Sequence, residues 1–116
     1  MAENIQRREH FRLLYPMQAR PTLNVRGAAH SLIEVSEEGG RLVATSVDAS
    51  AFNGCPRVML DFHDNHRIAT NATFLRIDGD EMVLKFFPAI PLSTILAEQR
   101  WLLSRFPKGQ PADSGN

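Results

Sequence analysis

The sequence predicts a mainly β fold, a small antiparallel barrel or sandwich followed by one C-terminal α-helix. Three observations support this prediction. The chain has 116 residues, the length of one domain with a single core. Short β-compatible runs alternate with turn residues over positions 17–86. After Pro88 and Pro91 the apolar spacing changes to that of a helix.

The first half of the chain is expected to hold three short strands. They are placed at residues 17–25, 31–35 and 42–47. The first carries Pro21, which lacks a backbone N–H and favours the edge of a sheet. The segment from Ser36 to Gly40 is expected to be a tight turn, because Gly39 and Gly40 allow positive φ or a close approach of a ligand. A loop follows over residues 48–56.

The second half is expected to hold three further strands. They are placed at residues 57–62, 66–77 and 81–86. Asp64-Asn65 is expected to be the turn between the first two strands. Asp78-Gly79 is a strong signal for a two-residue hairpin turn between the last two.

The predicted hairpin sets a cross-strand register. Leu75 is expected opposite Met82 and Arg76 opposite Glu81, so that one pair is apolar and the other oppositely charged. If Leu75 faces the core, Arg76 points outward beside Phe74. An outward aromatic residue next to an arginine can stack a base, but the pairing with Glu81 is the preferred interpretation. These positions are therefore not counted as site residues.

One helix is expected from about Thr94 to Phe106, with Ser93 as its N-cap. Its period gathers apolar side chains on one stripe, at Ile95, Leu96, Leu102, Leu103 and Phe106. Trp101 falls on the opposite face of this helix. It is either exposed at an interface or packed along Arg105 or a neighbouring loop.

Charge and composition exclude several classes of protein. Thirteen basic residues balance thirteen acidic ones, so a polyanion binder of the kind that coats DNA or RNA is not expected. No apolar run has the length of a membrane span or the pattern of a signal peptide, so we expect a cytoplasmic protein without membrane insertion. Cys55 is the only cysteine, which excludes an intrachain disulfide and a multi-cysteine zinc site.

Two groups of reactive residues are considered as functional sites and rejected. His63 and His66 flank a turn near Asp61, but no further ligand follows with the spacing of a zinc site. Cys55 lies in Gly-Cys-Pro without the cationic partner that activates a nucleophile. We therefore expect no metal, no cofactor and no catalytic residue, and do not expect an enzyme.

Two short motifs carry the functional prediction. The first is R-x-x-x-R in an arginine-rich N-terminal segment, and the second is E-x-S-x-x-G where a strand meets its turn. Twenty-one residues separate them, room for one strand and its connection. In order and spacing the motifs resemble those of the PilZ domain family, and the resemblance covers roughly residues 6–106. The candidate site residues are Arg7, Arg8, Arg12, Glu34, Ser36 and Gly39.

The resemblance implies a six-stranded antiparallel β-barrel, a PilZ-like split barrel, with a C-terminal α-helix. It also implies a stand-alone receptor for the bacterial second messenger cyclic di-GMP. The chain is then divided into a flexible arginine-rich arm at residues 1–12, the barrel with its helix at 13–106, and a disordered tail at 107–116. Ligand binding is expected to order the arm, and an unidentified protein effector is expected to receive the signal.

The two motifs suit this ligand, which carries two phosphodiester anions and two guanines. Arg8 and Arg12 can donate bidentate hydrogen bonds to phosphate oxygens or to guanine O6 and N7, and can stack on the bases. Ser36 can donate or accept through its hydroxyl, and Gly39 leaves room for a flat base. By the resemblance, Arg7 before the motif accompanies two stacked ligand molecules rather than one.

Glu34 departs from the family pattern, which has Asp or Asn at this position. Its carboxylate can accept from guanine N1–H and N2–H, but its oxygen lies about 1.5 Å from the expected place. A lost bidentate contact costs about 1–3 kcal/mol, so binding is expected to be weakened rather than abolished. Alternatively, Glu34 pairs with a nearby arginine, such as one of the arm, and competes with the ligand. The alternative function is a ligand-independent PilZ-like adaptor with a degenerate nucleotide site.

Overall fold

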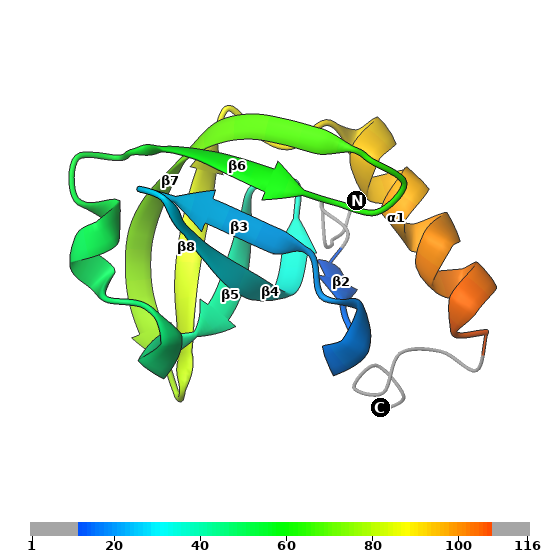
Figure 1. Ribbon diagram of the computed structural model, residues 1–116, viewed down its shortest axis with the longest axis horizontal. Coiled ribbons are helices and arrows are strands. Elements are labelled where there is room, and N and C mark those ends of the chain that lie inside the picture. The colour runs from blue at the N-terminus through cyan, green and yellow to red at the C-terminus, as the bar shows by residue number, and fades with distance from the viewer. Residues whose placement is uncertain (1–11, 108–116) are drawn as a thin grey trace, which may run out of the picture.

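A computed structural model describes residues 12–107, which form a closed antiparallel barrel of six strands with one further strand and a helix (Figure 1). The strands are β2 (Arg12–Leu14), β3 (Thr22–Val25), β4 (Ala28–Ser36), β5 (Gly39–Val43), β6 (Arg57–Asp61), β7 (Arg67–Asp78) and β8 (Glu81–Phe87). The barrel follows the order β3, β6, β7, β8, β5, β4, and β4 pairs again with β3. The predicted barrel with a C-terminal helix is confirmed.

Strand β2 lies outside this closed ring. It pairs with the second half of β4, whereas β3 pairs with the first half. Arg12 had been expected in the flexible arm, but it begins β2 and stands opposite Ser36. The rest of the expected arm, residues 1–11, and the expected tail from residue 108 lie outside the described residues.

Two of the expected strands are too long in the sequence-based prediction. Residues 17–25 divide into a 3-10 turn at Met17–Ala19 and strand β3. Residues 42–47 leave the sheet after Val43 and continue as a 3-10 turn at Ala44–Ser46. The Ser46 hydroxyl donates to the Val43 carbonyl at 2.7 Å, a local hydrogen bond that competes with strand pairing. The expected loop also contains a 3-10 turn, at Ala49–Phe52.

The hairpin between β7 and β8 forms one residue later than predicted. Its two-residue turn is Gly79-Asp80, with positive φ at Gly79, as in a type II′ turn. The predicted register is therefore wrong by two residues, because Ile77 rather than Leu75 lies opposite Met82. A register shift between Phe74 and Arg76 marks a bulge at Leu75.

The helix α1 (Leu92–Arg105) begins two residues earlier than predicted, and Pro91 rather than Ser93 is its N-cap. Ile95 and Leu102 are fully buried and join the barrel core, whereas Leu103 is half exposed, so the predicted apolar stripe is only partly correct. Figure 1 shows α1 at the end of the barrel that carries β2 and the β6–β7 turn. No helix within residues 12–107 is long and apolar enough to cross a membrane.

The buried carboxylate of Glu98 connects α1 to the barrel through hydrogen bonds. Glu98 is 1% exposed and accepts a hydrogen bond of 2.6 Å from the Tyr15 hydroxyl. It also accepts from the backbone N–H of His63 at 2.9 Å, and His63 Nδ1 lies 2.9 Å from its Oε1. Trp101 stacks on the His63 ring with 3.5 Å between ring centroids, and the Arg105 guanidinium lies 5.0 Å from the Trp101 centroid. Of the two interpretations of Trp101, packing on a neighbouring loop and on Arg105 is confirmed.

Burial of Tyr15, reinforced by the charge of Glu98, raises the pKa of its phenol. In the unfolded chain this group ionises above about pH 10, whereas the folded protein keeps the proton. We therefore expect the free energy of unfolding to fall above pH 10, by up to about 1.4 kcal/mol per pH unit. Urea unfolding between pH 8 and about pH 11 measures this slope. In a Tyr15→Phe protein the free energy of unfolding should fall less steeply above pH 10. An unchanged slope in that variant would show that another group causes the fall.

Candidate ligand-binding groove

The candidate site is a groove of about 390 Å³ at the side of the barrel, within the roughly 300–1,000 Å³ typical of small-molecule sites. Strands β2, β4, β5, β7 and β8 contribute to its wall. Its lining residues are Arg12, Glu34, Ser36, Glu38, Gly39, Gly40, Arg41, Leu75, Arg76, Val83, Leu84 and Lys85. The groove therefore gathers residues that lie far apart in the sequence.

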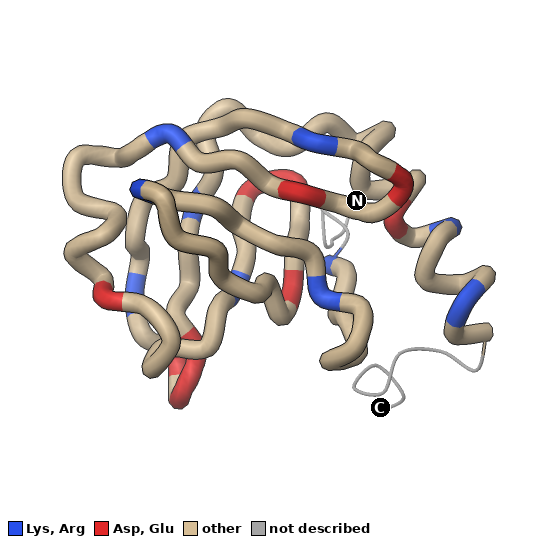
Figure 2. Tube along the Cα trace, viewed as in Figure 1, with Lys and Arg blue, Asp and Glu red and all other residues tan. Residues whose placement is uncertain are grey.

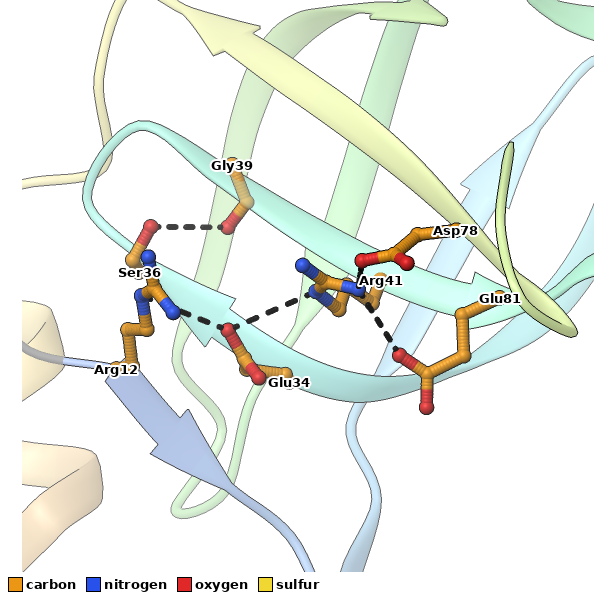
Figure 3. A network of polar contacts seen from close by, with 7 residues as sticks. All are labelled: Arg12, Glu34, Ser36, Gly39, Arg41, Asp78 and Glu81. Atoms are coloured by element: carbon orange, nitrogen blue, oxygen red, sulfur yellow. Dashed lines mark hydrogen bonds and ion pairs between the residues drawn. The ribbon is translucent and has the colours of Figure 1, made fainter. Parts of the chain in front are cut away.

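Four of the predicted site residues meet in this groove (Figure 3). The β2–β4 register sets Arg12 opposite Ser36, and Leu14 opposite Glu34. The Ser36 hydroxyl reaches the Gly39 carbonyl at 3.4 Å, across the turn that joins β4 to β5. The remaining two, Arg7 and Arg8, lie outside the described residues.

The Glu34 carboxylate lies between two arginines (Figure 3). Its Oε2 is 4.0 Å from Arg12 Nε and 3.9 Å from Arg41 Nε. Ion pairs of this length at a partly exposed site contribute only about 0–1 kcal/mol. The Arg12 side chain is 59% exposed, so it is accessible to a ligand.

Arg41 is held more firmly than Arg12. Its Nη1 donates to Asp78 Oδ2 at 2.8 Å and to Glu81 Oε1 at 3.3 Å, across the β7–β8 hairpin. The Asp78 hydrogen bond raises the pKa of Arg41, and the same bond lowers the pKa of Asp78. Arg41 thus supplies a fixed positive charge behind Glu34, whereas Arg12 supplies an exposed one.

Gly39 has a structural role that the sequence did not reveal. A Cβ atom built at this position would overlap the backbone carbonyl oxygen of Leu84 in β8. Gly39 stands opposite Lys85 in the β5–β8 pairing, where backbone atoms approach closely. Glycine is therefore required for closure of the barrel at this point. Its predicted role of admitting a flat base stays a prediction.

Sequence reasoning missed several residues of the groove wall. Arg41 and Lys85 come from β5 and β8, and neither belongs to a motif. Leu75 and Arg76 follow each other in β7, and both line the groove at the bulge. Leu75 was expected to face the core but is 48% exposed, while Phe74 packs against the core. Local alternation could not show this, because a bulge changes which face each residue occupies.

Basic side chains outnumber acidic ones among the residues that line the groove, by four to two. The basic residues are Arg12, Arg41, Arg76 and Lys85. Two further carboxylates, Asp78 and Glu81, contact Arg41 from the β7–β8 hairpin and offset this excess. Figure 2 shows basic and acidic positions mixed over the barrel and α1, and the full sequence is neutral.

Comparison with known proteins adds nothing to the resemblance to the PilZ family, which depends on the two motifs alone. No family model matches the chain, and no curated protein matches it. Within residues 12–107, no group of three or more His, Cys, Asp or Glu side chains is placed to hold a metal ion.

Proposed function

We propose that the protein is a receptor of the PilZ type that binds cyclic di-GMP in this groove. One observation carries the proposal: residues of both motifs line the same groove, although the motifs lie on separate strands. These residues are Arg12, Glu34, Ser36 and Gly39. The basic side chains that line the groove, among them Arg12, Arg76 and Lys85, suit a ligand with two phosphodiester anions. The barrel is also the fold that the resemblance implies.

Four side chains of the groove have a suitable partner on this ligand. Arg12 and Arg76 can form bidentate hydrogen bonds with phosphate oxygens or with the Hoogsteen edge of guanine. Glu34 can accept from guanine N1–H and N2–H, which are donors. Leu75 offers an exposed apolar surface beside Arg76, against which the face of a base can pack.

The proposed receptor is not an enzyme and transmits its signal through a protein effector in the cytoplasm. Two of the reactive residues that we rejected as site residues, His63 and Cys55, have structural partners, which supports this view. His63 is engaged by Glu98 and Trp101, and the Cys55 thiol accepts a hydrogen bond of 3.1 Å from the Thr73 hydroxyl. We propose no cofactor, no binding of DNA or RNA and no insertion into a membrane.

Titration calorimetry of cyclic di-GMP into the wild type and Arg12→Ala tests the proposal. We expect saturable binding at micromolar concentration or tighter in the wild type. The alanine variant should bind at least about tenfold more weakly, because one charge-assisted hydrogen bond contributes about 1.5–3 kcal/mol. Arg57→Ala is the matched control, since Arg57 is exposed on β6 and does not line the groove. Equal binding by both variants would remove Arg12 from the site.

One observation favours a second function, that of a ligand-independent adaptor. Glu34 already lies beside Arg12 and Arg41, so an internal carboxylate occupies the place of an anionic ligand. If the wild type shows no heat and no thermal shift up to about 100 µM ligand, where a weak ligand adds little stability, the adaptor function is favoured. Binding that appears only in Glu34→Asp would identify the extra methylene as the cause.

A further inference from the structure

Strand β2 connects the groove with helix α1. Arg12 at its first position lines the groove, and Tyr15 follows its last residue. The Tyr15 backbone N–H donates to the Ile33 carbonyl of β4 at 3.0 Å, so Tyr15 extends the pairing of β2. Its side chain leaves the sheet and reaches Glu98 of α1 at 2.6 Å. About 10 Å of extended chain therefore separates a groove residue from the buried attachment of the helix.

We infer that Glu98 is a positioning residue for the groove: through the Tyr15 hydroxyl it fixes strand β2, and with it Arg12, against Ser36. As a statement about ligand binding this inference rests on the proposed function. As a statement about the position of Arg12 it does not. A protein partner that engages α1 would change the affinity of the groove, and the ligand would change the affinity for that partner by the same factor.

Two features make β2 suited to this role. The six-stranded ring closes without β2, so this strand can shift without opening the barrel. Glu98 is also held independently of Tyr15, because the His63 backbone N–H donates to its other oxygen at 2.9 Å. Tyr15 is thus tied to a fixed point on the β6–β7 turn. Loss of its hydroxyl removes a long-range restraint on β2 and leaves the local pairing with β4.

Nuclear magnetic resonance tests the inference without a ligand. Tyr15→Phe is expected to shift the amide resonances of Arg12, three positions earlier in the chain, and of Ser36, which is paired with Arg12. Glu98→Gln keeps an oxygen that accepts from Tyr15 and should shift them less. Thr70→Val is the matched control, because it removes another buried hydroxyl. The Thr70 hydroxyl donates to the Pro88 carbonyl at 2.5 Å, and neither residue belongs to β2. Unmoved Arg12 and Ser36 resonances in a folded Tyr15→Phe protein would overturn the inference.

A binding cycle then separates this inference from the proposed function. Tyr15→Phe should weaken cyclic di-GMP binding about threefold or more when Arg12 is present. It should have no effect on the residual binding of Arg12→Ala, because it acts through Arg12. Equal effects in the two backgrounds would show that Tyr15 does not act through Arg12. If the wild type fails to bind at all, the proposed function fails, and the resonances of Arg12 and Ser36 alone decide the positioning role.

Discussion

Gly39→Ala is expected to lower the free energy of unfolding by about 2–3 kcal/mol, as in other cases of overpacking in a closely packed region. The new methyl group would overlap the Leu84 carbonyl, which is backbone and cannot turn aside as a side chain does. The β5–β8 pairing would have to separate, and this pairing helps to close the barrel. Denaturant unfolding measures the change as a lower midpoint with an unchanged slope.

Gly40→Ala is the matched control for this prediction. A Cβ at Gly40 would lie 3.1 Å from the Glu34 carbonyl oxygen and 3.1–3.2 Å from side-chain atoms of Leu32 and Phe86, contacts that shifts of a few tenths of an ångström relieve. We therefore expect a smaller loss, below about 1.5 kcal/mol. A Gly39→Ala protein that is as stable as the wild type but no longer binds cyclic di-GMP would reverse our assignment. Glycine would then serve the ligand and not the barrel.

The sequence predicted the second half of the barrel better than the first. Strands β6 to β8 coincide closely with predicted runs, because each is bounded by clear turn residues. The register between β7 and β8 was wrong because Gly79, not Asp78, takes the first turn position. The face of Leu75 was wrong because β7 bulges at this residue. A bulge arises where a strand must bend to close a barrel, so it depends on contacts that no local pattern contains.

The candidate site was predictable to the extent that it lies in short motifs. Arg12, Glu34, Ser36 and Gly39 could be named because R-x-x-x-R and E-x-S-x-x-G are contiguous in the sequence. The rest of the groove wall comes from β5, β7 and β8, and its residues meet only because the ring closes. Arg41 illustrates the difficulty, since its partners Asp78 and Glu81 lie 37 and 40 positions away in the sequence.

The attachment of α1 was invisible to sequence reasoning for a related reason. A helical period identifies apolar positions that face a core, and it found Ile95 and Leu102. The same period gives no reason to bury Glu98, because a buried carboxylate is stable only where donors are supplied. Those donors come from Tyr15 and His63, which are brought to α1 by β2 and by the β6–β7 turn.

Glu98→Ala is accordingly expected to destabilise the protein by about 3–5 kcal/mol. The truncation leaves the Tyr15 hydroxyl and the His63 backbone N–H without their acceptor, at about 1–3 kcal/mol for each buried unsatisfied group, and creates a cavity beside them. The stacking of Trp101 on His63 should loosen at the same time. Trp101 is the only tryptophan of the chain, so its fluorescence reports this change directly while denaturant unfolding gives the energy.

Two neighbouring variants show whether the carboxylate itself is responsible. Gln99→Ala removes a polar side chain from the next position of α1 and should cost within about 0.5 kcal/mol, because no buried hydrogen bond is lost. Glu98→Gln retains an acceptor oxygen and should lie between the two alanine variants. If Glu98→Ala were as stable as Gln99→Ala, the apolar contacts of Ile95 and Leu102 would suffice to hold α1. The hydrogen bond between Tyr15 and Glu98 would then contribute no stability, and β2 would have to be positioned by its pairing with β4 alone.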